Sequence, residues 1–524
     1  MMNGIHLTPR PFGFIQARFG STRLPGKILK CIPENGRDTL LDHIHNRLRK
    51  ILPKDFIVFL IPENDLKLAE FLKQRGYLYF LGSEVDVRDR YIKAAEKFGA
   101  EHIIRLTGDN PFIDLTAIEL LWEAMFHVNS ANYCLSMQGL PLGMGVECFS
   151  YSALRQNIDK YKEPRHTEHV SLHIKENLTE NAIYRLSPPH LNDKEQACSS
   201  QIRMTIDTPL DLKMMKDVWE ELGGNNSLFG AKDVIQLFLS KPEIFSTNQS
   251  VEQIRFDLPN ETNQKKKISM TYGEPAIYGS GHFERCKSLS IELQMAGFDT
   301  FCNPSGEKGF DGFIVDARER EPNGFPALLI DSLLPPKEET IHINLLPHPE
   351  GSEREPKDLS FYCSPMIELF KDQSTIPGQW MIYAGSLNSE ICTLLDQFLL
   401  KTASVKWDVK HWIRVGGTIP KSNLIQYFPR LTKYEYLELL SRSEGFLSYF
   451  GQSIMESLYL KKNTVLFGMT EIHKKLGEYF ANLANLTYIG EPDHLYIDGK
   501  SPSLSSIKLN RNGHLKIIKW AETL

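Results

Sequence analysis

The sequence contains no apolar run long enough to cross a membrane. A membrane-spanning helix needs roughly 18 to 20 consecutive apolar residues, and no stretch of the chain approaches that length. The N-terminal segment MMNGIHLTPRPFGF also lacks the long apolar core of a secretory signal. We therefore expect no membrane insertion and a cytoplasmic location.

Cysteine and excess positive charge are also scarce. The 524 residues include 8 cysteines, and no two of them form a CxxC pair. This scatter favours reduced thiols over a disulfide framework or a zinc site. The formal net charge of −5 argues against a nucleic-acid partner, so any basic cluster should have a local role.

Short β-rich runs alternate with segments of helical periodicity almost throughout the chain. The alternation predicts an α/β protein with mainly parallel sheets covered by helices on both faces. Because 524 residues are too many for one core, we expect several domains. The polar stretch at 246–267 is the best linker, after a first domain at 1–245. The second α/β body suits two subdomains, 268–375 and 376–524, the latter including a C-terminal tail.

A loop rich in glycine, hydroxyl and basic residues, ARFGSTRLPGK at 17–27, follows the first predicted strand. Glycines allow the backbone to approach a ligand closely, and the cations can offset charge on phosphorus and on departing pyrophosphate. At the carboxyl end of a parallel strand, this mixture favours a triphosphate. A basic turn that caps the next helix is the alternative. The candidate nucleotide-binding residues are Ala17, Arg18, Gly20, Ser21, Arg23 and Lys27.

Two aspartates follow predicted strands on the same sheet edge. Asp109 comes after HIIRLT, and Asp207 comes after IRMTI. Carboxylates placed together at that edge can hold Mg²⁺, which prefers oxygen ligands and usually keeps waters and substrate phosphates. The alternative is that each aspartate caps the helix that follows it.

Five ordered motifs carry a family resemblance over about residues 12–245: IQARFGSTRLPGK, RLTGDNPFID, GVECFS, TEHVS and TIDTPLDL. Together they resemble the sugar-acid cytidylyltransferases, above all the spore-coat-polysaccharide type and the 3-deoxy-manno-octulosonate enzymes. The resemblance implies a Rossmann-like (GT-A-like) nucleotidyltransferase domain that transfers CMP from CTP to a sugar acid and releases pyrophosphate. It further implies that Arg18 and Lys27 hold the phosphates and that Asp109 and Asp207 carry Mg²⁺. Glu147, Glu168 and His169 would then lie near the acceptor sugar.

The second half opens with a glycine-rich turn before a helix, in GSGHFERCKSL. Gly281 at the helix N-terminus favours a nearby phosphate, and His282 is a candidate general base. A structural histidine is the alternative. Further on, GFLSYFGQSIMES reads as strand, loop and helix, so Gly451 and Ser453 would lie where a diphosphate is favoured. Glu456 would accept ribose hydroxyls, or complete a capping box with Ser453.

GSGHFERC and, more loosely, FGQSIMES resemble motifs of the UDP-sugar hydrolases of the pseudaminic acid pathway. That resemblance covers about 268–490 and implies a two-lobed GT-B-like module that hydrolyses a UDP-sugar with His282 as base. The leading interpretation is thus a bifunctional enzyme of nucleotide-sugar biosynthesis. A GT-B glycosyltransferase and a non-catalytic nucleotide-binding scaffold are the alternatives for this half. The oligomeric state is left open, with a homodimer among the alternatives.

Overall fold

The computed structural model describes residues 9–224, 228–251, 265–273, 279–306, 309–347, 358–385, 387–497 and 502–524. The chain divides into two compact units, 1–265 and 266–524, each treated by itself below. Most of the predicted linker, 252–264, lies outside the described residues.

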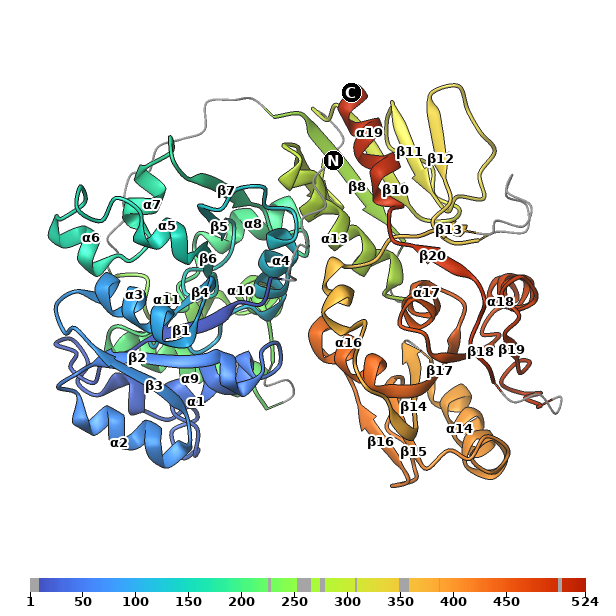
Figure 1. Cartoon of the computed structure of the whole chain (residues 1–524), viewed down its shortest axis with the longest axis horizontal. Coiled ribbons are helices and arrows are strands. Elements are labelled where there is room, and N and C mark those ends of the chain that lie inside the picture. The colour runs from blue at the N-terminus through green and yellow to red at the C-terminus, as the bar shows by residue number, and fades with distance from the viewer. Residues whose placement is uncertain are drawn as a thin grey trace. The chain divides into compact units, whose positions relative to one another are not determined.

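The first unit is built on a seven-stranded sheet with the order β3-β2-β1-β4-β6-β5-β7 (Figure 1). All neighbours are parallel except β6, which runs antiparallel to both β4 and β5. The mainly parallel α/β fold expected for this half is therefore confirmed, with one reversed strand. The strands are β1 (Phe12–Gln16), β2 (Ile57–Pro62), β3 (Leu78–Gly82), β4 (His102–Thr107), β5 (Tyr133–Met137), β6 (Glu147–Ser150) and β7 (Ala182–Leu186).

Helices cover the sheet of the first unit through two buried clusters. One cluster packs α3 against β1, β2 and β4, and the other gathers α9 and α10 around Phe112 and Ile206. The helices are η1 (Lys27–Leu29), α1 (Leu40–Leu48), η2 (Lys54–Phe56), α2 (Leu66–Arg75), α3 (Val87–Phe98), α4 (Leu115–Met125), α5 (Tyr151–Arg155), α6 (Pro164–Glu168), α7 (Leu172–Glu176), α8 (Asp193–Ser199), α9 (Pro209–Leu222), α10 (Ala231–Ser240) and α11 (Pro242–Ser246).

One strand expected from the sequence is not formed. Residues 202–206 make only an isolated bridge, between Arg203 and Leu142. Hydrogen bonds still fix the segment, because Met204 N donates to Leu142 O and Ile206 N donates to Asp109 O. The segment therefore runs beside the end of β4 without extending the sheet.

The second unit contains two parallel sheets, each with its own core. We call the five-stranded sheet with its helices (265–373 and 508–524) the first subdomain, and the six-stranded sheet with its helices (376–497) the second. The first sheet has the order β12-β11-β10-β8-β9, with β8 (Lys267–Tyr272), β9 (Asp299–Cys302), β10 (Gly312–Asp316), β11 (Ala327–Ile330) and β12 (Thr340–Ile343). The second has the order β16-β15-β14-β17-β18-β19, with β14 (Ile376–Gly385), β15 (His411–Gly416), β16 (Ile425–Phe428), β17 (Ser443–Tyr449), β18 (Asn463–Phe467) and β19 (Thr487–Tyr488).

Helices and one small strand pair complete this unit. The pair joins β13 (Asp358–Ser360) to β20 (Lys508–Asn510). The helices are α13 (Gly281–Met295), η3 (Pro365–Phe370), α14 (Ser389–Phe398), η4 (Leu399–Ala403), α15 (Ser404–Lys406), α16 (Lys433–Arg442), α17 (Gln452–Tyr459), α18 (Glu471–Ala484) and α19 (His514–Thr523). Parallel sheets agree with the expectation for this half, whereas its GT-B-like arrangement stays a prediction.

The predicted boundary assigned the C-terminal tail to the second subdomain, but in the structure its helix belongs to the first. Ile517, Trp520 and Ala521 have helical spacing, and all three are buried in the core of the first subdomain. In Figure 1 the red helix α19 lies beside β10 and α13. The chain end therefore returns to close the core with which the unit begins.

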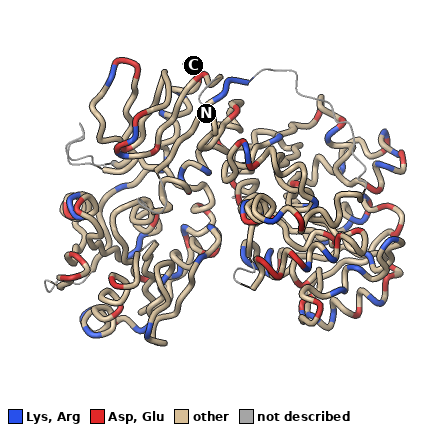
Figure 2. Tube along the Cα trace, turned by 180° about the vertical axis from the view of Figure 1, so that it is seen from behind, with Lys and Arg blue, Asp and Glu red and all other residues tan. Residues whose placement is uncertain are grey.

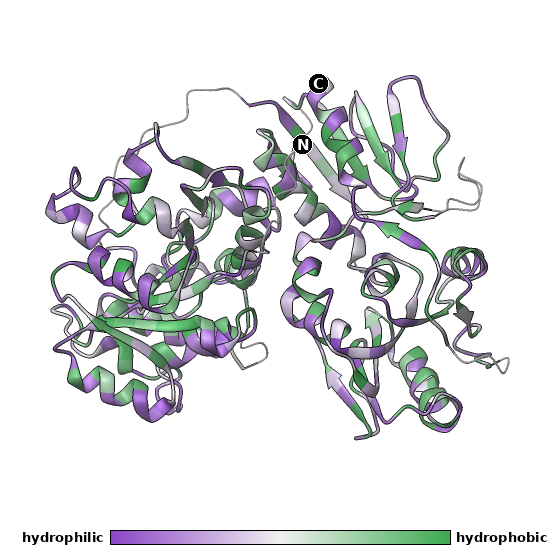
Figure 3. Ribbon diagram, viewed as in Figure 1, coloured by the Kyte–Doolittle hydropathy of each residue, from purple (hydrophilic) through white to green (hydrophobic). Residues whose placement is uncertain are grey.

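Hydropathy and charge follow the expected pattern of an ordinary α/β protein. Figure 3 shows hydrophobic residues along inner strands such as β2, all six of whose residues are buried. Lys, Arg, Asp and Glu are interspersed along both units (Figure 2). Among the described residues, no helix combines the length and apolar character needed to span a bilayer.

Candidate functional site

Lys27 lies at the centre of a charged cluster in the first unit. Its ammonium Nζ donates to Asp109 Oδ2 at 3.2 Å, to Asp207 Oδ1 at 2.9 Å and to Ile206 O at 2.7 Å. The three N–H donors of a lysine thus each meet one oxygen. The structure brings together the two aspartates predicted to share a site, although they are 98 positions apart in the sequence.

Asp207 is placed by the helix that follows it, but it does not cap that helix. The N-cap of α9 is Thr208, in a capping box with Asp211, and Asp211 Oδ2 also accepts from Asp207 N at 3.0 Å. The capping alternative for Asp207 is therefore wrong. It is also wrong for Asp109, because the N-cap of α4 is Asp114.

Three cations surround the Asp207 carboxylate. Besides Lys27, Arg23 lies 3.1 Å from Oδ1, and Arg203 donates to Oδ2 at 2.7 Å. Burial by itself raises the pKa of Asp207, but the hydrogen bond from Lys27 and the charges of the two arginines lower the pKa overall. The carboxylate is thus held ionised, as a metal ligand must be.

The residues of this cluster fit a magnesium ion whose remaining ligands come from the substrate and from water. Asp109 and Asp207 are two converging carboxylates, and Mg²⁺ is commonly bound by one or two carboxylates plus phosphates and waters. In the described part of the chain, no group of three or more His, Cys, Asp and Glu side chains could hold a metal alone.

The basic loop starts at the end of β1 and is fixed from one side. Phe19 N donates to Asp65 Oδ2 at 2.6 Å, and Leu24 N donates to Ser21 Oγ at 3.4 Å. Gly26 has a φ of 64°, the left-handed region that favours glycine, and it is the N-cap of η1, which starts with Lys27. The loop thus leads directly to Lys27 and does not cap α1, whose N-cap is Thr39.

The remaining loop residues predicted to contact nucleotide differ in exposure. Arg18 and Gly20 are exposed, and no heavy atom lies within 4 Å of the place that a Cβ on Gly20 would take. Ala17 is buried, and its N–H donates to Leu60 O at 3.1 Å. The open side of the loop therefore presents Arg18 and the Gly20 backbone.

Glu147 lies in a second charged cluster. Lys175 and Ser171 donate to its carboxylate, and Arg105 lies 3.5 Å from Oε2. Burial raises the pKa of Glu147, but Lys175 and Arg105 together lower it to about 2. Arg105 also donates to Gln16 Oε1 at 3.2 Å, so this cluster adjoins the residue that precedes the basic loop.

Glu168 and His169, the other two residues predicted to lie near the acceptor sugar, are at the end of α6. Glu168 is its last residue and is exposed, and His169 is its C-cap. Burial lowers the pKa of His169, and the nearby charges that act on it include Arg105, Glu147 and Lys175. His169 therefore joins the second cluster, whereas Glu168 is oriented toward solvent.

Three cations of these clusters escaped the sequence reasoning: Arg105, Lys175 and Arg203. Arg105 could have been identified from the sequence, because it is the one charged residue in the strand HIIRLT. Arg203 lies four residues before Asp207 and could have been paired with it. Lys175 had no local signal.

In the second unit, His282 is paired with a carboxylate. Its Nδ1 lies 2.6 Å from Asp316 Oδ1, and Arg285 Nε donates to Asp316 Oδ2 at 2.7 Å. Although burial raises the pKa of Asp316, Arg285 and His282 hold it below its usual range. The residue that precedes His282, Gly281, lies against Gln452, whose Cβ is 3.3 Å from the place of a Cβ on Gly281. The N-termini of α13 and α17 are therefore neighbours.

As the sequence predicted, Gly451 and Ser453 lie at the N-terminus of α17, which starts at Gln452. Its N-cap is Gly451, without a side-chain cap, so the capping box of Ser453 and Glu456 is not formed. Both side chains are buried, with 9% and 5% of their surfaces exposed. Burial, reinforced by Glu284, raises the pKa of Glu456 to about 7 against the opposing effect of Lys433. Glu456 is thus a candidate proton-handling group.

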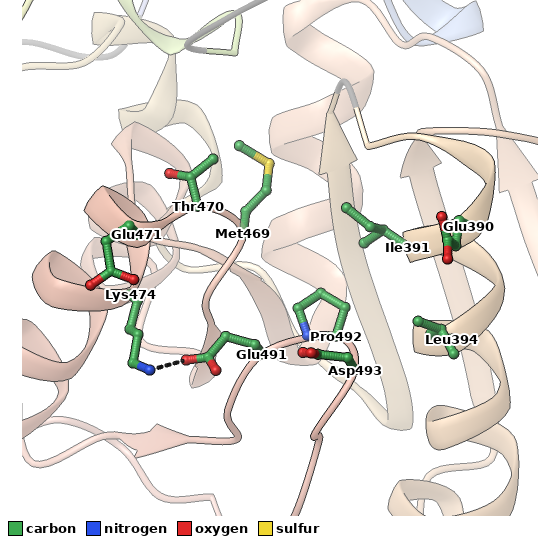
Figure 4. A pocket seen from close by; sticks show the side chains of 10 residues that line it. All are labelled: Glu390, Ile391, Leu394, Met469, Thr470, Glu471, Lys474, Glu491, Pro492 and Asp493. Atoms are coloured by element: carbon green, nitrogen blue, oxygen red, sulfur yellow. Dashed lines mark ion pairs between the residues drawn. The ribbon is translucent and has the colours of Figure 1, made fainter.

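A pocket of about 370 Å³ lies in the second subdomain, between the beginnings of α14 and α18 (Figure 4). Lys474 pairs with Glu491 at 3.0 Å across one side. The lining combines carboxylates with apolar side chains: Glu390, Ile391, Leu394, Met469, Thr470, Glu471, Lys474, Glu491, Pro492 and Asp493. None of these residues was predicted from the sequence.

Comparison with known proteins places the first unit. The family model described as cytidylyltransferase matches residues 12–244. The spore coat polysaccharide biosynthesis protein SpsF of Bacillus subtilis is 33% identical over 237 residues, which are 44% of this chain and 94% of that protein. An uncharacterized protein of Methanocaldococcus jannaschii is 32% identical over 244 residues, 46% of this chain and 95% of that protein.

A solved structure of a cytidylyltransferase from Leptospira borgpetersenii is 29% identical, with a TM-score of 0.42, and covers 47% of this chain and 100% of that chain. The relatives from Bacillus subtilis and Methanocaldococcus jannaschii, both more than 30% identical, are matched over nearly their whole length. Through its first unit, the chain belongs to the cytidylyltransferase family.

Proposed function

We propose that the first unit transfers CMP from CTP to a sugar acid and releases pyrophosphate. The observation that carries the proposal is that Asp109 and Asp207 both contact Lys27, the last residue of the glycine-containing basic loop. Membership of the cytidylyltransferase family supports the nucleotide. Partial similarity to a 3-deoxy-manno-octulosonate cytidylyltransferase of Solibacter usitatus, 32% identical over 117 residues and 44% of that protein, supports a sugar-acid acceptor.

In this reaction the acceptor hydroxyl oxygen gives its proton to water and forms a bond to the α-phosphorus. The bond from that phosphorus to the pyrophosphate oxygen breaks, and its electron pair leaves with pyrophosphate. Asp109 and Asp207 would hold Mg²⁺, which supplies charge neutralisation and orientation of the phosphates. Arg18 and Arg23 offset the charge that grows on the leaving pyrophosphate. Lys27 holds the two carboxylates together before substrate arrives, so less ordering remains to be done on binding.

The second cluster of the first unit suits the acid group of the acceptor. Arg105 and Lys175 carry two positive charges against the single negative charge of Glu147. The excess positive charge favours the binding of a carboxylate. The hydrogen bond from Arg105 to Gln16 links the cluster to the start of the basic loop. The acceptor would thus lie next to the α-phosphate.

A direct test incubates the protein with CTP, Mg²⁺ and a panel of 3-deoxy sugar acids, with pyrophosphate release as the readout. We expect release with CTP and at least one acid, and little release with ATP or UTP. Absence of CTP-dependent release across the whole panel would contradict the proposal.

For the second unit we propose hydrolysis of a nucleotide sugar such as a UDP-sugar. The supporting observation is the pairing of His282 Nδ1 with Asp316, which orients the ring so that Nε2 can take a proton from an attacking water. A glycosyltransferase would release UDP only when an acceptor sugar is supplied, and a scaffold would release none. UDP release from UDP-N-acetyl sugars, with and without acceptors, separates these three functions. His282→Asn should stop the release if hydrolysis is correct.

A further inference from the structure

Arg318, two residues beyond the end of β10, is a buried cation without a partner. Only 6% of its surface is exposed, and in the described part of the chain its guanidinium makes no hydrogen bond or ion pair. A guanidinium carries five N–H donors, and the described residues supply no acceptor to those of Arg318. Such an arrangement is expected where a ligand supplies the acceptors.

The carboxylates near Arg318 are already occupied. Asp331 Oδ1 accepts from the backbone N–H groups of Leu345 and Leu346 at 2.6 and 2.9 Å, and Asp331 Oδ2 accepts from Arg285 at 2.7 Å. Asp316 is shared by Arg285 and His282. Arg285 Nη1 is itself buried without a hydrogen-bond partner. The two arginines and two aspartates balance in charge, but the carboxylates are occupied by other donors, so N–H donors are in local excess at this edge of the sheet.

The second subdomain contributes a histidine to the same place. The ring of His473, near the start of α18, lies 5.1 Å from that of Tyr449, whose hydroxyl is 3.0 Å from the place of a Cβ on Gly279, just before α13. Burial, and then the charges of Arg318 and His282, lower the pKa of His473 to about 4. Its Nδ1 lies 2.7 Å from the Thr470 hydroxyl. When that hydroxyl donates to Nδ1, the ring proton lies on Nε2, where it can be donated to a ligand oxygen.

We propose that Arg318 and His473 form an oxyanion-binding site that joins the two subdomains of the second unit. The ligand is a small molecule that carries a phosphate or a carboxylate. Thr470, which positions His473, also lines the pocket of Figure 4, whose carboxylates can accept hydrogen bonds from sugar hydroxyls. A phosphorylated or acidic sugar derivative fits both features. This site does not depend on whether His282 catalyses hydrolysis.

The test compares Arg318→Gln with Arg320→Gln in the full-length protein. Arg320 is a matched control because it is an exposed arginine in the same segment. Calorimetric titration uses UDP against uridine for a phosphate, and N-acetylneuraminate against its methyl ester for a carboxylate. We expect wild type and Arg320→Gln to bind one of the two anions, and Arg318→Gln to lose at least about tenfold in affinity, as the loss of charge-assisted hydrogen bonds implies.

Thermal unfolding without ligand provides the second readout. Because Arg318 makes no contact that folding would lose, Arg318→Gln should unfold at or above the wild-type temperature. Equal binding by all three proteins, no binding of either anion by wild type, or a lower unfolding temperature in Arg318→Gln would each overturn the proposal. The last result would assign the arginine a structural role.

Discussion

The role of an ionisable residue in this chain depends on the charges that surround it. Lys27 and Glu456 are both ionisable and largely hidden from solvent, yet their surroundings differ. Lys27 meets three oxygens, so its charge is compensated. Glu456 is buried, and the nearby Glu284 opposes its ionisation. Glu456 is therefore able to change its protonation state near neutral pH.

Glu456 should make stability depend on pH. Its folded pKa of about 7 exceeds the ordinary value of 4.5, so between these values the folded state binds more protons than the unfolded state. Stability then falls as pH rises through this window, by up to about 1.4 kcal/mol per pH unit. We expect Glu456→Gln to match wild type in unfolding temperature at pH 5 and to exceed it at pH 7.5. A difference that is the same at both pH values would contradict this assignment.

At the scale of elements, α9 positions the candidate metal ligand. Asp211 is fully buried, and its carboxylate accepts from the backbone of Asp207 and of Thr208, from Arg203 and from Asn248. Among the predicted site residues that the structure describes, Asp207 is the one that hydrogen-bonds to Asp211. Asp211 is thus a positioning residue that connects the start of the helix to the site.

Asp211→Asn should lower activity through Asp207. The amide group replaces one acceptor oxygen by a donor, and leaving a buried donor unpaired costs about 1–3 kcal/mol. We expect a lower unfolding temperature and a kcat for pyrophosphate release reduced about tenfold, with a smaller change in KM for CTP. Asp217→Asn on the same helix is the control and should change neither quantity. An unchanged kcat in a destabilised Asp211→Asn protein would limit Asp211 to a structural role.

Local signals predicted most elements, and long-range contacts decided the rest. α3 ends at Gly99, as its sequence indicates, because the glycine adopts a φ of 67°. Residues 202–206 have the apolar pattern of a strand, but their backbone bonds go to Leu142 and Asp109 instead of to a sheet. The prediction that Asp207 lies near Asp109 was thus correct, but backbone contacts between distant segments, and not a strand, bring the two together. Lys175 joins the second cluster only through the fold.

At the scale of the molecule, two units with separate cores carry the two proposed activities. The second unit is closed by its own C-terminal helix, whose Trp520 is 6% exposed within the first subdomain. All the described residues of that core belong to the second unit. Damage to one core is therefore expected to leave the chemistry of the other unit intact.

Trp520→Ala should destabilise the second unit alone. Truncation of a buried tryptophan costs about 3–5 kcal/mol. Calorimetry of the full chain should show one unfolding transition moved to lower temperature, while a second transition and CTP-dependent pyrophosphate release remain as in wild type. Loss of release together with the lowered transition would mean that the units do not fold independently.

The rate of CTP-dependent transfer shows whether Lys27, with Asp109 and Asp207, forms its centre. Pyrophosphate release from CTP, with Mg²⁺ and the accepted sugar acid, is compared among wild type, Lys27→Ala and Lys30→Ala. Lys30 is the control, because it lies three residues away and its side chain makes no hydrogen bond or ion pair with described residues. We expect Lys27→Ala to lose about a hundredfold or more in rate, equivalent to ~3 kcal/mol, and Lys30→Ala to stay near wild type. A folded Lys27→Ala protein that turns over like wild type would contradict this expectation.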